Sequence, residues 1–249
     1  MRRIAIGNMK GGVGKSTLAA NISAGLALMK QKVLLLDLDG QENSGLYLGI
    51  QKDQYNKTFY DLIDRRNPAT LEECIIPARD NLDILPNLLL DQVEADLHRE
   101  PRIDLLFNEK LAPLGEMGYD FVIVDSPPLR TRVNAAVFLW VDHIILPVQL
   151  EVSSVQGVGM IYEYLSELRI NPNIIKLVVP TMMNKRTNDS KMHLNFLKEF
   201  FKDENILTNP IPRRTKVNEA ATRGLSIFEY DEKVATHFLR IIERMIEVV

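Results

Sequence analysis

A glycine-rich segment near the start of the chain has the composition of a phosphate-binding loop. It reads Lys10-Gly11-Gly12-Val13-Gly14-Lys15-Ser16-Thr17. Glycine has no side chain, so successive backbone N–H groups can turn toward an anion, and a following helix adds partial positive charge at its N-terminus. The common form of this loop begins with a glycine where this chain has Met9. The sequence therefore predicts a site for nucleotide phosphates, with a departure from the common motif.

The last residues of this segment have the side chains that a nucleotide and its metal require. We expect Lys15 to contact the β- and γ-phosphates, the Ser16 hydroxyl to bind Mg²⁺ and Thr17 to reach the α-phosphate. A glycine-rich turn that binds nothing is the alternative. The loop follows an apolar strand pattern at 4–8 and precedes an amphipathic helix pattern at 18–29, which argues against that alternative. ATP and Mg²⁺ are thus the expected ligands.

Two further apolar stretches end in aspartates. Residues 33–36 precede Asp37 and Asp39, and residues 121–124 precede Asp125. Open α/β sheets place their ligands at the carboxyl ends of the strands, and a hard carboxylate suits an ion that keeps part of its water shell. We predict that Asp125 holds Mg²⁺ through a bound water. Each aspartate could instead only end or cap a core strand.

Lys10 is the distinctive residue, because a lysine so early in the loop has no required role in an ordinary P-loop. The pattern Lys-Gly-Gly-x-Gly-Lys-Ser/Thr resembles that of the deviant Walker A ATPases, the family that includes ParA and MinD. The resemblance implies that Lys10 reaches across a homodimer interface to the partner's nucleotide. It also implies that Asp39 orients or deprotonates the attacking water and that Asp37 lies near the metal's water shell. Lys10, Lys15 and Asp39 are the catalytic residues expected on this basis.

The resemblance to ParA extends over nearly the whole chain. Residues 144–149 and Gly157 resemble the stretch that follows switch II, and residues 181–187 and 211–220 resemble the C-terminal half. A departure occurs at 39–43, where Asp-Gly-Gln-Glu-Asn replaces the ParA pattern Asp-Pro-Gln-Gly-Asn. Its glycine loosens a turn that proline would stiffen, which affects the expected conformation of switch I.

Basic residues are concentrated in the C-terminal half. The net charge is -3, yet residues 185–223 contain nine Lys or Arg against five Asp or Glu. In the ParA family the segment equivalent to 211–220 borders the adenine and carries a basic side chain used for DNA. The resemblance thus implies Pro212 as a nucleotide contact. The implied DNA-binding residues are Arg186, Arg213, Arg214 and Lys216. A solvated charged face is the alternative.

The function implied by the resemblance is that of a ParA-like ATPase without an N-terminal helix-turn-helix domain. It would dimerise with ATP, bind DNA non-specifically and respond to a ParB-like or cargo-adaptor protein, partitioning plasmid or chromosome DNA or positioning another cargo. A MinD-like membrane-associated ATPase and a metabolic ATP-dependent ligase are the alternatives. Residues 232–249 place apolar side chains on one side without a basic cluster for lipid, so we expect packing against the sheet and no membrane contact. We therefore expect the protein to be cytoplasmic and associated with the nucleoid.

The elements that would position these residues alternate along the chain. Strands are predicted at 4–8, 32–37, 82–85, 121–125, 143–147, 174–180 and 206–211. Helices are predicted at 16–29, 103–111, 154–168 and 190–201, with short helices between 50 and 80. This alternation predicts a doubly wound, mostly parallel α/β sheet with helices on both faces, and the length of 249 residues fits a single domain, 1–249.

Overall fold

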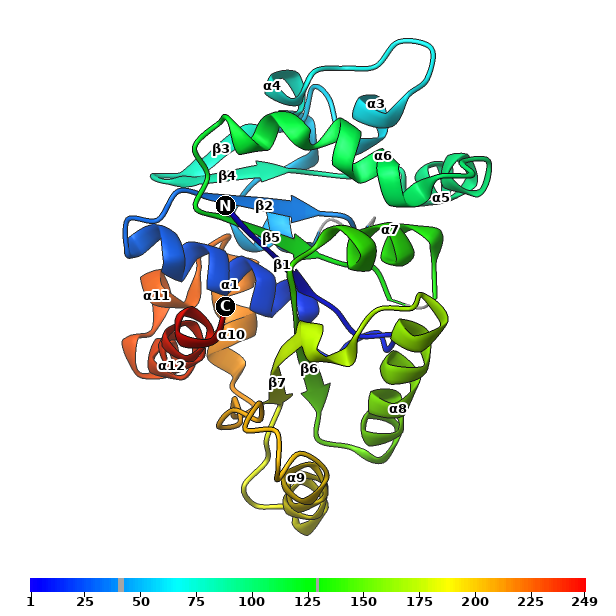
Figure 1. Ribbon diagram of the computed structural model, residues 1–249. Coiled ribbons are helices and arrows are strands. Elements are labelled where there is room, and N and C mark those ends of the chain that lie inside the picture. Colours follow the sequence, from blue (N-terminus) through cyan, green and yellow to red (C-terminus); the bar gives the residue numbers. More distant parts are fainter. Residues whose placement is uncertain (40–42, 129) are drawn as a thin grey trace.

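The centre of the molecule is a seven-stranded sheet with strand order β3-β4-β2-β5-β1-β6-β7 (Figure 1). It is seen in a computed structural model that describes residues 1–39, 43–128 and 130–249. Strand β3 runs antiparallel to β4, and all other neighbours are parallel. The predicted doubly wound, mostly parallel sheet is therefore confirmed. The strands are β1 (Arg2–Ile6), β2 (Val33–Asp37), β3 (Ile76–Arg79), β4 (Leu82–Leu85), β5 (Phe121–Asp125), β6 (His143–Gln149) and β7 (Ile175–Thr181).

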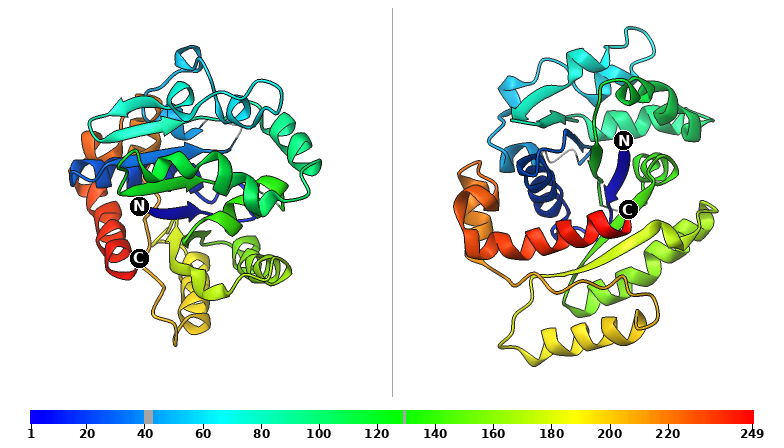
Figure 2. Two further views of the ribbon diagram at one scale, coloured as in Figure 1. Left: turned by 45° about the horizontal axis from the view of Figure 1, so that its top comes forward. Right: turned by 60° about the vertical axis from the view of Figure 1, so that its left-hand side comes forward.

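Helices cover both faces of the sheet (Figures 1 and 2). One face carries α1 (Lys15–Leu28), α10 (Thr215–Thr222), α11 (Ile227–Tyr230) and α12 (Glu232–Val248). The other face carries α5 (Leu90–His98), α6 (Ile103–Lys110), α7 (Arg132–Trp140) and α8 (Val152–Glu167), with α9 (Asn188–Phe200) beyond β7. Shorter elements are α2 (Asn43–Tyr47), α3 (Phe59–Ile63), α4 (Leu71–Cys74) and the 3₁₀ turns Lys52–Gln54, Ala112–Gly115 and Pro172–Ile174.

The central strands are apolar throughout because both of their faces are buried. Successive side chains of a strand point to opposite faces. On β1, Ile4 and Ile6 pack in the core below α1 and α12, whereas Ala5 packs in the core below α6, α7 and α8. Helix α12 confirms the predicted packing of the C-terminal segment against the sheet, since Phe238 and Ile242 are buried in the first of these cores. None of the helices in the described part of the chain is long and apolar enough to cross a membrane.

At one edge of the sheet a predicted strand does not form, and at the opposite edge there is a strand that was not predicted. Residues 206–211 form no strand; isolated bridges join Leu207 to Val178 on β7 and the following Pro212 to Met183, beyond the end of β7. Pro210 and Pro212 lack the N–H groups that a continuous ladder needs, which explains the interruption. Strand β3 was missed because Pro77 argues against a strand, but an edge strand tolerates proline, and the register shifts beside it.

Candidate functional site

The glycine-rich loop joins the end of β1 to the N-terminus of α1. Gly12 and Gly14 have φ values of 75° and 94°, in the left-handed region that strains any side chain. The carbonyl of Gly14 accepts the backbone N–H of Leu18 at 2.9 Å and so begins the helix. A Cβ built on Gly11 or Gly12 would meet no heavy atom within 4 Å. The outer side of the loop is therefore open, as an anion bound by backbone N–H groups requires.

Two polar side chains from outside the motif hold this loop against the sheet. The buried Asn8 donates from Nδ2 to the Pro147 carbonyl at 2.6 Å and accepts the Lys10 N–H at 3.0 Å. Thr181, at the end of β7, donates its hydroxyl to the Val13 carbonyl at 2.9 Å. The roles of Asn8 and Thr181 were not predicted from the sequence. Asn8 was predicted to lie inside the first strand, whereas β1 ends before it. These bonds fix the loop on strands β6 and β7.

Asp37 and Asp125 lie side by side, since they end the neighbouring strands β2 and β5 in register. Both are buried, and in the described part of the chain the Oδ1 atom of each has no hydrogen-bond partner. A buried polar atom without a partner is costly, so this edge favours a ligand that satisfies it. Hard carboxylate oxygens beside the hydroxyl of Ser16, which bonds Asp125, fit Mg²⁺ with part of its water shell.

The pKa values of Asp37, Asp125 and Lys15 are shifted by burial and by the charges of neighbouring groups. Burial raises the pKa of Asp37 well above its usual value, and the charges of Asp125 and Asp39 raise it further. Burial also raises the pKa of Asp125 to about 6, although hydrogen bonds from two serine hydroxyls oppose the increase. The pKa of Lys15 is lowered by burial, against the effect of Asp125 and Asp39. A divalent cation would therefore stabilise the ionised carboxylates, which burial disfavours.

Helix α2 is bonded to both strand-end carboxylates. The Ser44 hydroxyl donates to Oδ2 of Asp125 at 2.6 Å, and the Gly45 N–H donates to Oδ2 of Asp37 at 3.3 Å. Sequence analysis did not select Ser44. The departure from the ParA pattern at Gly40-Gln41-Glu42 lies outside the described residues. Asp39 precedes that segment and is 8% exposed, within reach of the Lys15 charge.

A cavity of about 310 Å³ continues from the loop toward the C-terminal half. Gly14 and Thr17 line it together with Pro212, Val217 and Asn218, and its lining also includes Arg213 and Arg214. Apolar and amide groups in a cavity suit a planar heterocycle with a few polar edges. Pro212 and the phosphate loop thus line the same cavity.

Arg79 on β3 connects the end of α2 to the end of α10. Its guanidinium donates to the carbonyls of Leu48 at 2.7 Å and Gly224 at 3.0 Å, and it pairs with Glu229. Gly224 lies against Gly49 so closely that an added Cβ would be 2.5 Å from the Gly49 Cα atom. Helix α2, which is bonded to Asp37 and Asp125, and helix α10, which lines the cavity, are therefore joined through Arg79 and the two glycines.

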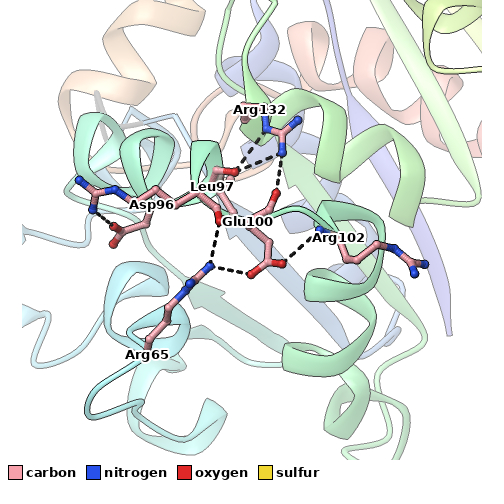
Figure 3. Close-up of polar contacts among 7 residues, drawn as sticks. Arg65, Asp96, Leu97, Glu100, Arg102 and Arg132 are labelled. Atoms are coloured by element: carbon pink, nitrogen blue, oxygen red, sulfur yellow. Dashed lines mark hydrogen bonds and ion pairs between the residues drawn. The ribbon is translucent and has the colours of Figure 1, made fainter.

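Helix α7, which follows Asp125 along the chain, is held by α5 in a similar way (Figure 3). Arg132 begins α7, and its guanidinium donates to the carbonyls of Leu97 at 3.3 Å and Glu100 at 2.7 Å. The Glu100 carboxylate in turn pairs with Arg65 at 2.8 Å. The carboxylate of Glu94 accepts the N–H groups of the first two residues of α7. The two helices thus satisfy each other's terminal backbone groups.

Comparison with known proteins identifies the family to which this site belongs. Residues 1–176 match the model of a family described as AAA domain. The chain is 30% identical over 240 residues to the chromosome partitioning protein ParA of Caulobacter vibrioides, covering 94% of this chain and 89% of that protein. The chain belongs to the ParA/MinD-type family of P-loop ATPases.

A second relative supports the assignment to the ParA/MinD-type family, and a solved structure has the same fold. The sporulation initiation inhibitor protein Soj of Bacillus subtilis is 31% identical over 241 residues, covering 92% of this chain and 91% of Soj. Among solved structures, a putative plasmid partition protein from Borrelia burgdorferi bound to AMPPNP superposes with a TM-score of 0.86 at 24% identity. That superposition covers 100% of this chain and 99% of the Borrelia chain, so the fold of this ParA/MinD-type protein is shared over its whole length.

The two lysines of the ParA/MinD-type loop differ in their surroundings. Lys15 is 5% exposed and donates from Nζ to the Lys10 carbonyl at 3.1 Å. The Lys10 side chain instead forms an ion pair with Glu151, directly before α8, and 27% of it is exposed. Gln149 donates to the other Glu151 oxygen at 2.9 Å. Lys10 is thus bound within its own subunit, and nothing in the sequence had indicated Glu151 as its partner.

Three of the four predicted DNA-binding residues of this ParA/MinD-type chain come together. Arg186, Arg213 and Arg214 surround a hollow of about 350 Å³, which Lys185 also lines. The N–H of Arg186 is bonded to Oδ1 of Asn184 at 3.1 Å, which shapes the turn after β7. All four basic residues are exposed.

Lys216, the fourth predicted residue, is not among those that line this hollow. Its Nζ lies 3.2 Å from the Glu219 carboxylate and 5.3 Å from the ring centre of Tyr230. Arg223 lies over the same ring, at 5.2 Å. The charge of Lys216 is therefore partly neutralised by Glu219, in contrast to the arginine cluster.

Proposed function

We propose that this chain is a ParA-like partition ATPase whose ATP-bound form is a homodimer that binds DNA non-specifically. One observation carries the proposal: an open glycine cradle, a buried lysine and two carboxylates with unpartnered oxygens meet at the carboxyl edge of the sheet. The 30% identity to the chromosome partitioning protein ParA of Caulobacter vibrioides supports the same assignment. The relevant reaction is hydrolysis of ATP to ADP and phosphate.

The proposed nucleotide site uses residues of the loop and its surroundings. The N–H groups of residues 11–17 and the Lys15 ammonium would hold the phosphates, and the base would occupy the cavity beside Pro212. Ser16, Asp37 and Asp125 would hold Mg²⁺, the aspartates through water, and the ion would neutralise phosphate charge. Asp39 would orient the attacking water or accept a proton from it.

Dimerisation would involve a change of partner for Lys10. In the subunit it pairs with Glu151, so contact with a nucleotide on the other subunit requires that this ion pair separates. An ion pair that is partly exposed is weak in water, so the exchange costs little. Nucleotide phosphates, which carry more negative charge than one carboxylate, would attract Lys10 more strongly. This exchange would make the dimer depend on bound ATP.

Non-specific DNA binding is proposed for the hollow formed by Arg186, Arg213 and Arg214. Arginine suits phosphate because its planar donors can make two parallel hydrogen bonds. Contacts to the backbone give affinity without reading the sequence, and a dimer doubles their number. A ParB-like or cargo-adaptor protein would stimulate hydrolysis and so release the DNA. The protein would act on the nucleoid in the cytoplasm.

Gel filtration of wild type and Asp39→Ala with ATP and with ADP tests the nucleotide-dependent dimer. We expect Asp39→Ala to accumulate a dimer with ATP and Mg²⁺ because it binds but does not hydrolyse, and to remain monomeric with ADP. Asp80→Ala, which removes an exposed aspartate in the turn between β3 and β4, is the matched control and should behave as wild type. A monomer in every nucleotide state would refute the proposed dimer.

A further inference from the structure

A second basic hollow lies on the same side of the molecule, between α9 and α12. Its volume is about 360 Å³, and four of its lining residues are basic: Lys198, His237, Arg240 and Arg244. The remaining wall includes residues 207–209, from the segment that runs between the two helices (Figure 2). We refer to it as the α9–α12 hollow.

The cations of the α9–α12 hollow are incompletely neutralised. Within the described part of the chain neither Lys198 nor Arg240 forms an ion pair. Arg244 pairs with Glu247 at 2.8 Å and donates to the Asn205 carbonyl at 3.2 Å. Uncompensated positive charges that line one hollow raise the local concentration of anions. The hollow therefore suits a ligand that carries negative charge.

The α9–α12 hollow is electrostatically continuous with the arginine hollow described above. His237, in its wall, is close enough to Arg214 and Lys185 for their charges to act on it, and both of these residues line the arginine hollow. One basic surface thus extends from the turn after β7, past the start of α10, to α9 and α12. A repeating polyanion matches such a surface better than an isolated anion does.

We propose that the α9–α12 hollow binds backbone phosphates of the nucleic acid that occupies the arginine hollow, and that His237 takes up a proton on binding. This inference rests on the proposed DNA-binding function and defines the path of the DNA. It also assigns the extension of the interface to Lys198 and Arg240, which form no ion pair in the described part of the chain, rather than to Lys216, whose charge is shared with Glu219.

The direction of the proton linkage follows from the surroundings of His237. Burial lowers the pKa of His237, and the charges of Arg240, Arg214 and Lys185 lower it further. Of the other cations that line the hollow, Lys198 lies on α9 and Arg244 lies on α12, where it pairs with Glu247. The imidazole is therefore largely neutral at neutral pH, and a phosphate that cancels this field would raise its pKa. DNA affinity should then increase as pH falls, by about tenfold for each unit of that increase.

The pH dependence is tested with full-length, ATP-loaded protein and a random-sequence duplex at low salt, at about pH 6 and about pH 8. We expect wild type to bind more tightly at the lower pH. His237→Gln should bind at both pH values as wild type does at the higher one, and His237→Arg should remain tight at both. His98→Gln, on the distant helix α5, is the matched control and should keep the wild-type response.

The salt dependence tests the hollow independently of protonation. Arg240→Gln and Lys198→Gln should each weaken binding and reduce the slope of log affinity against log salt by about one, as expected for one lost phosphate contact. Arg66→Gln removes one exposed charge beyond the opposite edge of the sheet and should leave the slope unchanged. Thermal melting establishes that each variant is folded.

The possible outcomes separate this inference from the proposed function. If wild type binds DNA but the variants of the α9–α12 hollow match Arg66→Gln and His98→Gln, the inference is wrong and the DNA-binding proposal stands. If ATP-loaded wild type does not bind DNA at low salt at either pH, the proposed function itself fails, and this inference fails with it.

Discussion

Replacement of Asp125 by asparagine should stabilise the ligand-free protein above neutral pH. The buried Asp125 has its pKa raised from 3.8 to about 6, so ionising it in the folded state is unfavourable. At 1.36 kcal/mol for each pKa unit, this shift corresponds to about 3 kcal/mol of lost stability. The cost is absent below the unfolded pKa, grows between about pH 4 and about pH 6, and is complete above the folded pKa. Asparagine keeps the shape and an acceptor for Ser44 but cannot ionise.

The assay is urea unfolding of ligand-free wild type and Asp125→Asn, in the presence of a chelator, at about pH 5 and about pH 8. Asp125→Asn should be more stable than wild type by up to about 3 kcal/mol at the higher pH, with a smaller difference at the lower pH. Asp80→Asn is the exposed control and should match wild type at both. Mg²⁺ with ATP should stabilise wild type much more than Asp125→Asn. Equal or lower stability of Asp125→Asn at the higher pH would refute the reasoning.

Three further predictions follow from contacts around the site. Asn8→Ala removes two of the bonds that hold the phosphate loop against the sheet, so it should lower ATP affinity and cost about 1–3 kcal/mol in unfolding free energy, measured by nucleotide titration and urea unfolding. Gly224→Ala forces a Cβ to 2.5 Å from a neighbouring backbone atom at a positive φ and should lower the melting temperature, whereas Gly115→Ala, with nothing within 4 Å, should not. Glu151→Gln should remove the Lys10–Glu151 ion pair and strengthen the ATP-dependent dimer in sedimentation; unchanged dimerisation would show that this ion pair does not oppose the dimer.

The sheet and the phosphate loop were predictable because their signals are local. A strand buried on both faces is apolar at every position, and the loop is defined by the spacing of glycine and lysine within eight residues. The prediction of strands failed at the edges of the sheet, where contacts with other parts of the chain decide whether a strand forms. Pro77 is compatible with a strand only because β3 lies at an edge, and the predicted strand at 206–211 is reduced to an isolated bridge between Leu207 and β7.

The contacts that complete the site could not be predicted, since they join residues far apart in the chain. Asn8 and Pro147 are 139 positions apart, and Ser44 meets Asp125 across 81 positions. The surroundings of the basic residues also could not be predicted from the sequence. Nothing in the sequence shows that Lys216 is paired within its own helix while other basic residues gather around two hollows.

The central claim is that ATP switches this protein between a free and a DNA-bound form. The most direct test is retention of Asp39→Ala on a random-sequence duplex at low salt, with ATP and Mg²⁺ or with ADP and Mg²⁺. We predict strong retention with ATP, loss of retention with ADP, and a steep decrease in retention as salt increases. Equal retention in the two nucleotide states, or none in either, would contradict the account.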